Sequence, residues 1–414
     1  MSTITDVKGR LVFNSRGNKA IEIDVITDSK FLGRACAPSG ASVGKNEVQS
    51  FVENSPERTL ENFNSNKSKF IGIDSTNPRI LHEVLREIDK TETYSIIGGA
   101  VAYALSIASI DSASKALQTP FFKIIQPNSL YKFPFPLGNV LGGGAHAGPG
   151  TPDIQEFLVC PKGAKNIFQA LEMNFIVHKQ VMRILENIDN KFTYGRGDEG
   201  GWAPNINNEQ AFEVVEKAIT NSGFTKKDVA MGIDFASSSL WNEKTQLYHY
   251  SRQGINRTTE EQIEFVNSLI KDYDLIYAED PVHEEDFQSM SIVNSKNKKC
   301  FVTGDDMLVT NKNRVKIASK IKSCSGAILK VNQAGTIFDA LEFANECMND
   351  KIGIITSHRS GESIDSHIAH IAIATNSKML KTGILGGERI AKLNELLRIN
   401  EYDLINGLTD LHVS

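Results

Sequence analysis

Three acidic residues stand where they could bind a metal ion, because each of them ends a short apolar run. The runs cover 229–234, 275–279 and 300–305, and they end in Asp234, Glu279 and Asp305. Buried strands that alternate with helices show this pattern, and the C-terminal ends of such strands carry the chemistry of barrel enzymes. A single acid at a strand end usually meets solvent or caps a helix. Three in register favour a site for a hard divalent cation such as Mg²⁺.

Two further residues with useful chemistry end runs of the same kind. Lys330 follows Ala327-Ile-Leu, and His358 follows the run over 352–357. A buried lysine near metal cations can have its pKa lowered enough to act as a base. A lysine that extends to solvent or pairs with an acid fits Lys330 equally well. Converging carboxylates with a lysine beside them nevertheless favour an enzyme.

Glycine-rich loops carry other candidates, namely Glu199, His146 with Glu156, and the segment Ser357-His-Arg-Ser-Gly361. A guanidinium beside a hydroxyl, as in that last segment, suits an oxyanion such as phosphate. Gly195-x-Gly-x-x-Gly200 matches the dinucleotide-binding fingerprint, but Trp-Ala-Pro follows it where a helix should begin. We therefore regard that match as a coincidence.

The elements that must position these residues fall into two parts. In the first part, residues 20–27 alternate like a half-buried strand, 30–37 follow as a hairpin partner, and 98–117 form an alanine-rich helix. Strands followed by helices suggest an α+β unit. The composition then becomes loop-like. We predict an N-terminal α+β capping domain over 1–126 and a catalytic domain over 127–414.

A strand–helix rhythm takes over in the second part. Strand ends are spaced by roughly 25–45 residues, as one β/α unit per interval requires. Thr258-x-x-Glu261 is a capping-box pattern, and it opens a helix with one apolar face formed by Ile263, Val266, Leu269 and Ile270. The predicted fold class is α/β, a TIM-like (β/α) barrel of about eight units with the N-terminal domain packed near its mouth.

The bulk composition excludes several classes of protein. At 414 residues the chain is long enough for two domains, since single cores stop growing near ~250–300 residues. A net charge of −5 gives no general attraction to nucleic acid or anionic membranes. Five scattered cysteines argue for reduced thiols and against a disulfide framework or structural zinc. No signal core or membrane-spanning stretch is evident, so we expect a cytoplasmic protein.

Taken together, these segments resemble the enolase family, the magnesium-dependent phosphopyruvate hydratases. The matching motifs stand in the family's order and include Ser15-Arg-Gly-Asn18, Pro38-Ser-Gly-Ala-Ser42, Gly143-Gly-Ala-His-Ala147, Gln155-Glu-Phe157, Gly197-Asp-Glu-Gly-Gly201, Glu279-Asp-Pro281, Gly304-Asp-Asp306, Leu329-Lys-Val-Asn-Gln333, Ser357-His-Arg-Ser-Gly-Glu362 and Lys381-Thr-Gly383. The resemblance implies an enolase-type barrel. It also implies a lyase of glycolysis and gluconeogenesis that interconverts 2-phospho-D-glycerate and phosphoenolpyruvate.

The resemblance further implies two Mg²⁺ ions per site. Asp234, Glu279 and Asp305 are expected to hold the first, conformational ion. Ser39, on a loop that closes over the substrate, is expected to contact the second, catalytic ion and the substrate. The implied partners are a small phosphorylated carboxylate and further copies of the chain in a homodimer or a multiple of dimers, with neither nucleic acid nor membrane.

The same resemblance implies roles in catalysis and substrate binding. Lys330 is expected to remove the C2 proton, and Glu199, supported by Glu156, is expected to help the C3 hydroxyl leave. The remaining implied pocket residues are His146 and His358, the phosphate grip of Arg359 and Ser360, the carboxylate contact Lys381 and the polar residue Gln155.

Some positions depart from the family pattern. Asn14 stands where Asp is usual, Lys19 stands where Pro is usual, and the segment Pro149-Gly-Thr-Pro152 differs from the commonest form of its loop. No residue with an implied contact to metal or substrate is missing. The departures therefore bear on loop movement, subunit contacts and turnover.

Two other functions compete with this one. A superfamily relative acting on another carboxylate with an α-proton, such as a racemase or an ammonia lyase, is disfavoured by Arg359 and Ser360, which suit a phosphorylated substrate. The second is a binding protein that kept the fold and lost activity, with a secondary location at the cell surface. Some family members bind host proteins through a C-terminal lysine, whereas this chain ends in Val413-Ser414.

Overall fold

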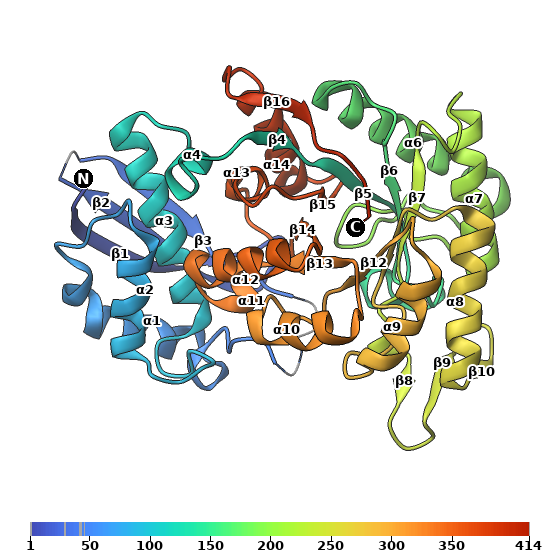
Figure 1. Cartoon of the computed structure of the whole chain (residues 1–414), viewed down its shortest axis with the longest axis horizontal. Helices are drawn as coiled ribbons and strands as arrows, with labels where there is room; N and C mark the ends of the chain where they lie inside the picture. Colours follow the sequence, from blue (N-terminus) through green and yellow to red (C-terminus); the bar gives the residue numbers. More distant parts are fainter. Residues whose placement is uncertain (1, 29, 41–43, 45, 414) are drawn as a thin grey trace.

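The computed structural model describes residues 2–28, 30–40, 44 and 46–413. Its first part is an antiparallel sheet in the order β1-β2-β3, packed against helices (Figure 1). The elements are β1 (Ile4–Phe13), β2 (Lys19–Thr27), β3 (Leu32–Cys36), η1 (Val52–Asn54), α1 (Pro56–Asn66), η2 (Lys67–Phe70), α2 (Pro78–Ile88), α3 (Gly99–Leu117) and α4 (Phe121–Ile125). The predicted hairpin is formed by β2 and β3, and the predicted alanine-rich helix is α3.

Helix α3 is buried along most of its length because it packs on the N-terminal sheet and also touches the second part of the chain. Gly33 of β3 allows the close approach to the sheet, since a Cβ atom there would lie 2.0 Å from the carbonyl oxygen of Ala108. On the other side, the amide of Ile337 donates to the hydroxyl of Ser106 at 3.2 Å. The small residues of α3 thus bring the two parts together.

The second part contains a closed barrel whose described strands follow the order β11-β12-β13-β14-β15-β5-β6-β7. The barrel strands are β5 (Phe135–Gly142), β6 (Glu156–Cys160), β7 (Ala230–Asp234), β11 (Tyr277–Glu279), β12 (Phe301–Gly304), β13 (Gly326–Leu329), β14 (Gly353–Ser357) and β15 (Met379–Gly383). Large apolar side chains fill its interior, among them Leu137, Leu158, Ile328 and Ile355. The predicted TIM-like barrel is therefore confirmed.

Strand β6 runs antiparallel to both of its neighbours, whereas the other barrel pairs are parallel. The connection from β5 to β6 carries only the one-turn helix α5 (Gly144–Ala147), which is too short for the crossover that a parallel pair needs. The barrel thus departs from one β/α unit per strand. As a result β6 begins, rather than ends, at the mouth: its first residue, Glu156, pairs with Asp234, the last residue of β7.

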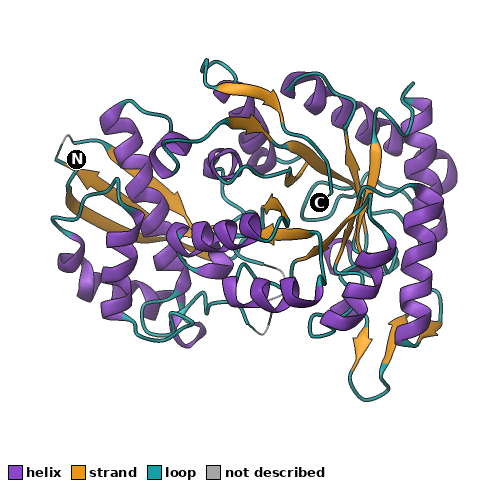
Figure 2. Ribbon diagram, viewed as in Figure 1, coloured by secondary structure: helices purple, strands orange, loops and turns teal. Residues whose placement is uncertain are grey.

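Helices cover the outside of the barrel (Figure 2). They are α6 (Ile167–Ile188), α7 (Asn208–Asn221), α8 (Thr259–Tyr273), α9 (Phe287–Lys296), α10 (Lys312–Ile321), α12 (Ile337–Asn349), α13 (His367–Ala374) and α14 (Gly387–Ile399), whereas the short helices η3 (Ser237–Ser239) and α11 (Val331–Ala334) lie beside the mouth. Two small sheets complete the fold: β8 (Trp241–Asn242) with β9 (Leu247–Tyr250) and β10 (Ile255–Arg257), and β4 (Tyr131–Phe133) with β16 (Ile405–Leu408).

The local predictions for α8 hold. Thr258 caps the helix in a capping box with Glu261, and Ile263, Val266 and Ile270 are buried.

The C-terminal residues Leu411 and Val413 pack against the barrel interior. The five cysteines are buried free thiols. Among the described helices, none is long and apolar enough to cross a membrane.

Candidate active site at the barrel mouth

A pocket of about 260 Å³ opens at the carboxyl ends of the parallel barrel strands. Among the described residues, eight carboxylates line it, against three lysine or arginine side chains and two histidines. These residues are Glu47, Glu156, Glu199, Asp234, Asp280, Glu284, Asp305, Asp306, Lys330, Lys381, Arg359, His146 and His358. An anionic substrate would add to the excess of negative charge, so such a pocket requires additional cations.

Strand register brings the three predicted metal ligands to this mouth. Glu279 at the end of β11 pairs with Asp234 at the end of β7, and Asp305 directly follows the next strand, β12. All three carboxylates are buried, with at most 8% of the residue surface exposed. Hard carboxylate oxygens are the ligands that Mg²⁺ prefers, so the donor set fits the implied cation.

Lys381 of β15 lies among these acids. Its Nζ atom is 3.1 Å from Asp234 Oδ2, 2.5 Å from Glu279 Oε2 and 3.3 Å from Glu156 Oε1. Burial by itself lowers the pKa of Lys381, but the acids around it raise that pKa well above its usual range. Lys381 therefore remains charged and compensates part of the buried negative charge.

Lys330, which follows β13, donates from Nζ to Asp305. Burial lowers the pKa of Lys330, but the charge of Asp305 raises it, and the net direction is upward. The sequence left two interpretations of Lys330 equally open, a base with a lowered pKa beside metal cations and a lysine that pairs with an acid. The described arrangement contains the pairing with Asp305, and the role of Lys330 as a base stays a prediction.

Asp280 is a pocket residue that the sequence interpretation missed. Its two carboxylate oxygens accept hydrogen bonds from the backbone amides of Asp305 and Asp306, at 3.0 and 2.9 Å. Its backbone has a φ of 41°, which is strained for a residue other than glycine. Asp280, Asp305 and Asp306 also form one of two described groups whose ligand atoms lie within 4.8 Å of one another. The only signal in the sequence was the second acid of Glu279-Asp-Pro281.

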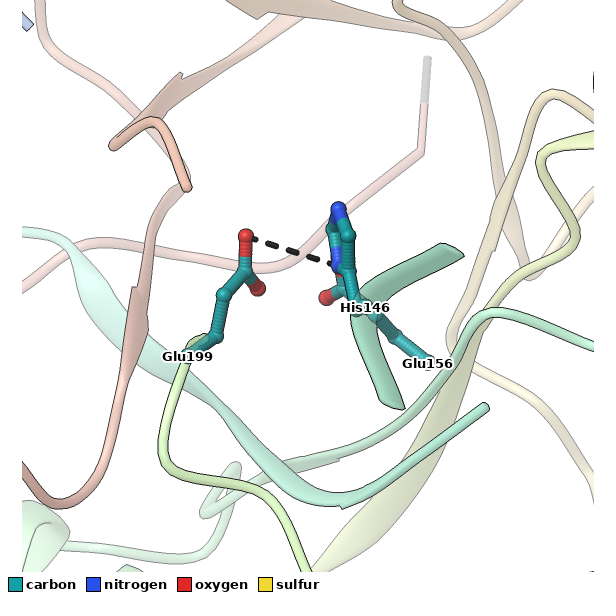
Figure 3. A group of neighbouring side chains, drawn as sticks. All are labelled: His146, Glu156 and Glu199. Atoms are coloured by element: carbon teal, nitrogen blue, oxygen red, sulfur yellow. Dashed lines mark ion pairs between the residues drawn. The ribbon is translucent and has the colours of Figure 1, made fainter. Parts of the chain in front are cut away.

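His146, Glu156 and Glu199 form the other such group. Figure 3 shows both carboxylates directed towards the same imidazole, whose Nδ1 atom is 3.3 Å from Glu156 Oε1 and 3.7 Å from Glu199 Oε1. Burial lowers the pKa of His146, but Glu199 and Glu156 raise it to about 9. Burial and the charge of Glu199 raise the pKa of Glu156 to about 7.

The pKa of Glu199 is shifted in the opposite direction to that of Glu156. Burial raises the pKa of Glu199, but His358 and His146 together lower it well below its usual range. The closest contact is from His358 Nε2 to Glu199 Oε2, at 3.1 Å. Because the two carboxyls face the same imidazole, they titrate as one unit, with the pKa raised at Glu156 and lowered at Glu199.

The predicted phosphate-binding residues lie at the same mouth. Arg359 is buried and pairs with Glu47 at 2.9 Å, and Ser360 Oγ is 3.4 Å from His146 Nε2. Gln155 donates to Asp234 Oδ2 at 3.2 Å. Glu47 was not predicted from the sequence, which offers no pattern that would single it out.

Ser39 does not itself line this pocket, although the next residue, Gly40, does. Ser39 forms an isolated antiparallel bridge with Gly361, and its hydroxyl accepts a hydrogen bond from Asn14 Nδ2 at 2.9 Å. In this arrangement the Ser39 hydroxyl contacts Asn14, and the metal and substrate contacts expected of Ser39 stay a prediction. Residues 41–43 and 45 of the same loop, including the other serine, Ser42, lie outside the described residues.

Comparisons with known proteins agree with this arrangement. Residues 4–125 match the family described as "Enolase, N-terminal domain", and residues 130–406 match "Enolase, C-terminal TIM barrel domain". The chain is 43% identical over 416 residues to the enolase of Methanosphaera stadtmanae, covering 99% of this chain and 100% of the relative. It is 39% identical to the enolase of Methanothermobacter thermautotrophicus, covering 99% of each, and 41% identical to that of Archaeoglobus fulgidus, covering 96% and 97%. The chain therefore belongs to the enolase family, a family of glycolytic lyases.

Proposed function

We propose that the enzyme reversibly dehydrates 2-phospho-D-glycerate to phosphoenolpyruvate in a Mg²⁺-dependent reaction. One observation carries the proposal: the lysine and the acid pair stand on opposite walls of the pocket. Lys330 follows β13 and Glu156 begins β6, and these strands are diametrically opposite in the order of the closed barrel. A substrate between them can lose a proton to one wall and a hydroxyl group towards the other.

In the proposed dehydration, neutral Lys330 takes the proton from C2, and the electron pair of that C–H bond forms the C2–C3 double bond. The C3 hydroxyl leaves as water, and the proton that it needs comes from the carboxyl pair of Glu156 and Glu199. Lys381 and Arg359 bind the anionic groups of the substrate. Positioned groups of this kind contribute typically about 10²–10⁴-fold each.

Asp234, Glu279 and Asp305 would hold the proposed Mg²⁺. When bound, the cation neutralises the charge that develops on the substrate carboxylate. It would also weaken the ion pair between Asp305 and Lys330, which would favour the neutral lysine. The contact of Ser39 with a second ion stays part of the proposal, because a hydroxyl that accepts one hydrogen bond from Asn14 has a further lone pair. The number of ions stays a prediction.

The activity is tested by following the enolpyruvate absorbance after 2-phospho-D-glycerate and Mg²⁺ are added. We expect a rise in absorbance that EDTA abolishes. The absence of an EDTA-sensitive rise would refute the proposal.

Lys330→Ala should lower kcat by about 10²–10⁴-fold with an unchanged circular dichroism spectrum. The matched control is Lys378→Ala, because Lys378 lies beside the other end of β15 and pairs with the exposed Asp410. Substantial activity in Lys330→Ala would exclude this lysine as the base.

The resemblance is also the basis for proposing a homodimer, a cytoplasmic location and a domain boundary at 126/127, between α4 and β4. Light scattering of the purified protein measures its oligomeric state. A monomer at the working concentration would contradict the proposed homodimer.

A further inference from the structure

Arg389 lies in the first turn of α14 and, among the described residues, is the largest side chain that is fully buried. Its two terminal nitrogens donate to four acceptors. These are His358 Nδ1 at 2.8 Å and the carbonyl oxygens of Arg359 at 2.7 Å, Asp198 at 2.9 Å and Ser360 at 2.8 Å. Arg389 does not line the substrate pocket. A buried cation that contacts a pocket histidine from behind can orient that histidine without touching substrate.

The contact with His358 determines where the imidazole carries its proton. A guanidinium has only N–H donors and stays charged, so the nitrogen that faces it must accept. The amide of Gly383 approaches the same Nδ1 atom at 3.3 Å. With Nδ1 accepting, the proton is on Nε2, and this atom lies 3.1 Å from Glu199 Oε2.

We propose that Arg389 is a positioning residue that holds His358 in its neutral Nε2–H tautomer, so that His358 donates to Glu199 and keeps that carboxyl ionised beside Glu156. The catalytic consequence rests on the proposed function, whereas the tautomer itself does not. Orienting partners of this kind typically change activity by about 10–100-fold when they are removed.

A purely structural role gives different expectations. Arg389 also joins the loop that contains Asp198 to the carbonyls of Arg359 and Ser360. If that were its whole function, its removal would loosen the phosphate grip and raise KM, and the tautomer of His358 would stay as it is. If it selects the tautomer, kcat falls and the His358 signal changes.

The direct test is nitrogen NMR of the full chain with ¹⁵N-labelled histidine, in the resting enzyme at neutral pH. The spectrum of a His358→Gln variant assigns the His358 signals. We expect wild-type His358 to show a protonated Nε2 and an unprotonated Nδ1. Arg389→Met should lose this single pattern and give a mixture of tautomers, and Arg389→Lys, which keeps a charged N–H donor group, should restore it at least in part.

Kinetics completes the test. Arg389→Met should lower kcat by about 10–100-fold with little change in KM, and Arg389→Lys should recover part of the loss. The control is Lys392→Met: Lys392 is also buried on α14, but it donates to the carbonyls of Ser363 and Asp365 and does not contact His358. This control should lower the melting temperature and leave the tautomer unchanged.

A wild-type His358 with its proton on Nδ1, or an Arg389→Met protein with an unchanged Nε2–H signal, overturns the proposal. If Arg389→Met does not fold, the wild-type and Arg389→Lys spectra still decide. Correct NMR signals in a protein that does not convert 2-phospho-D-glycerate would refute the proposed function and leave the assigned tautomer intact.

Discussion

Glu156→Gln should make the protein more stable at pH 8 while it lowers activity. Burial and Glu199 raise the pKa of Glu156 from 4.5 to about 7. Between these two values the folded state binds a proton at Glu156 that the unfolded state does not bind. Stability due to this group is therefore greatest at low pH and is lost as the pH rises through about 7. Each unit of pKa difference between the folded and unfolded states is worth about 1.4 kcal/mol. The ionised carboxylate therefore destabilises the folded state by about 3 kcal/mol at pH 8.

Glutamine imitates the neutral carboxyl, so Glu156→Gln should recover most of that energy at pH 8 and little of it at pH 5. Glu199→Gln is the matched control with the opposite sign. The pKa of Glu199 is depressed, since His358 and His146 outweigh its burial. Its ionised form is the stabilising one above the unfolded value of 4.5, and this contribution is lost only as the pH falls through the folded pKa. Glu199→Gln should therefore be less stable than wild type at pH 8 and at pH 5.

The assay is thermal unfolding of the wild type and both variants with EDTA present, at pH 8 and pH 5, alongside kcat with Mg²⁺. We expect kcat to fall by about 10²–10⁴-fold in both variants, because each loses one carboxyl of the pair. A Glu156→Gln variant that melts below wild type at pH 8 would refute the reasoning. So would a stabilisation of equal size at both pH values, because the effect must follow ionisation.

Two further variants test other parts of the structure. Lys381→Met removes the cation between Asp234 and Glu279 and should lower the unfolding free energy by about 3–5 kcal/mol at neutral pH, with a smaller loss when Mg²⁺ is added; a loss that ignores Mg²⁺ would speak against a cation site here. Gly33→Ala should lower the unfolding free energy by about 1–3 kcal/mol, because its Cβ would lie 2.0 Å from the carbonyl oxygen of Ala108, and kcat should not change. An unchanged melting temperature would mean that α3 moves away from the added Cβ atom at no cost in stability.

Much of the fold and of the candidate site could be predicted because the relevant signals are local. Apolar runs that end in Asp234, Glu279 and Asp305 placed three acids at strand ends, and a capping box at Thr258 placed the start of α8. These patterns depend on neighbouring residues in the chain. Motif order added the family, and with it the expected roles of residues on loops that have no period of their own.

The sequence by itself therefore determined the strand–helix rhythm, the barrel and the chemical types of the site residues. Only the tertiary structure decided that β6 runs antiparallel, so that Glu156 begins a strand beside Asp234, and that Ser39 turns towards Asn14. It also decided the contacts between charged groups, since Lys381 lies among the acids and Arg389 donates to His358 from behind. The physical reason is that burial and long-range pairing fix strand direction, proton positions and pKa values, and residues distant in sequence become neighbours only when the barrel closes.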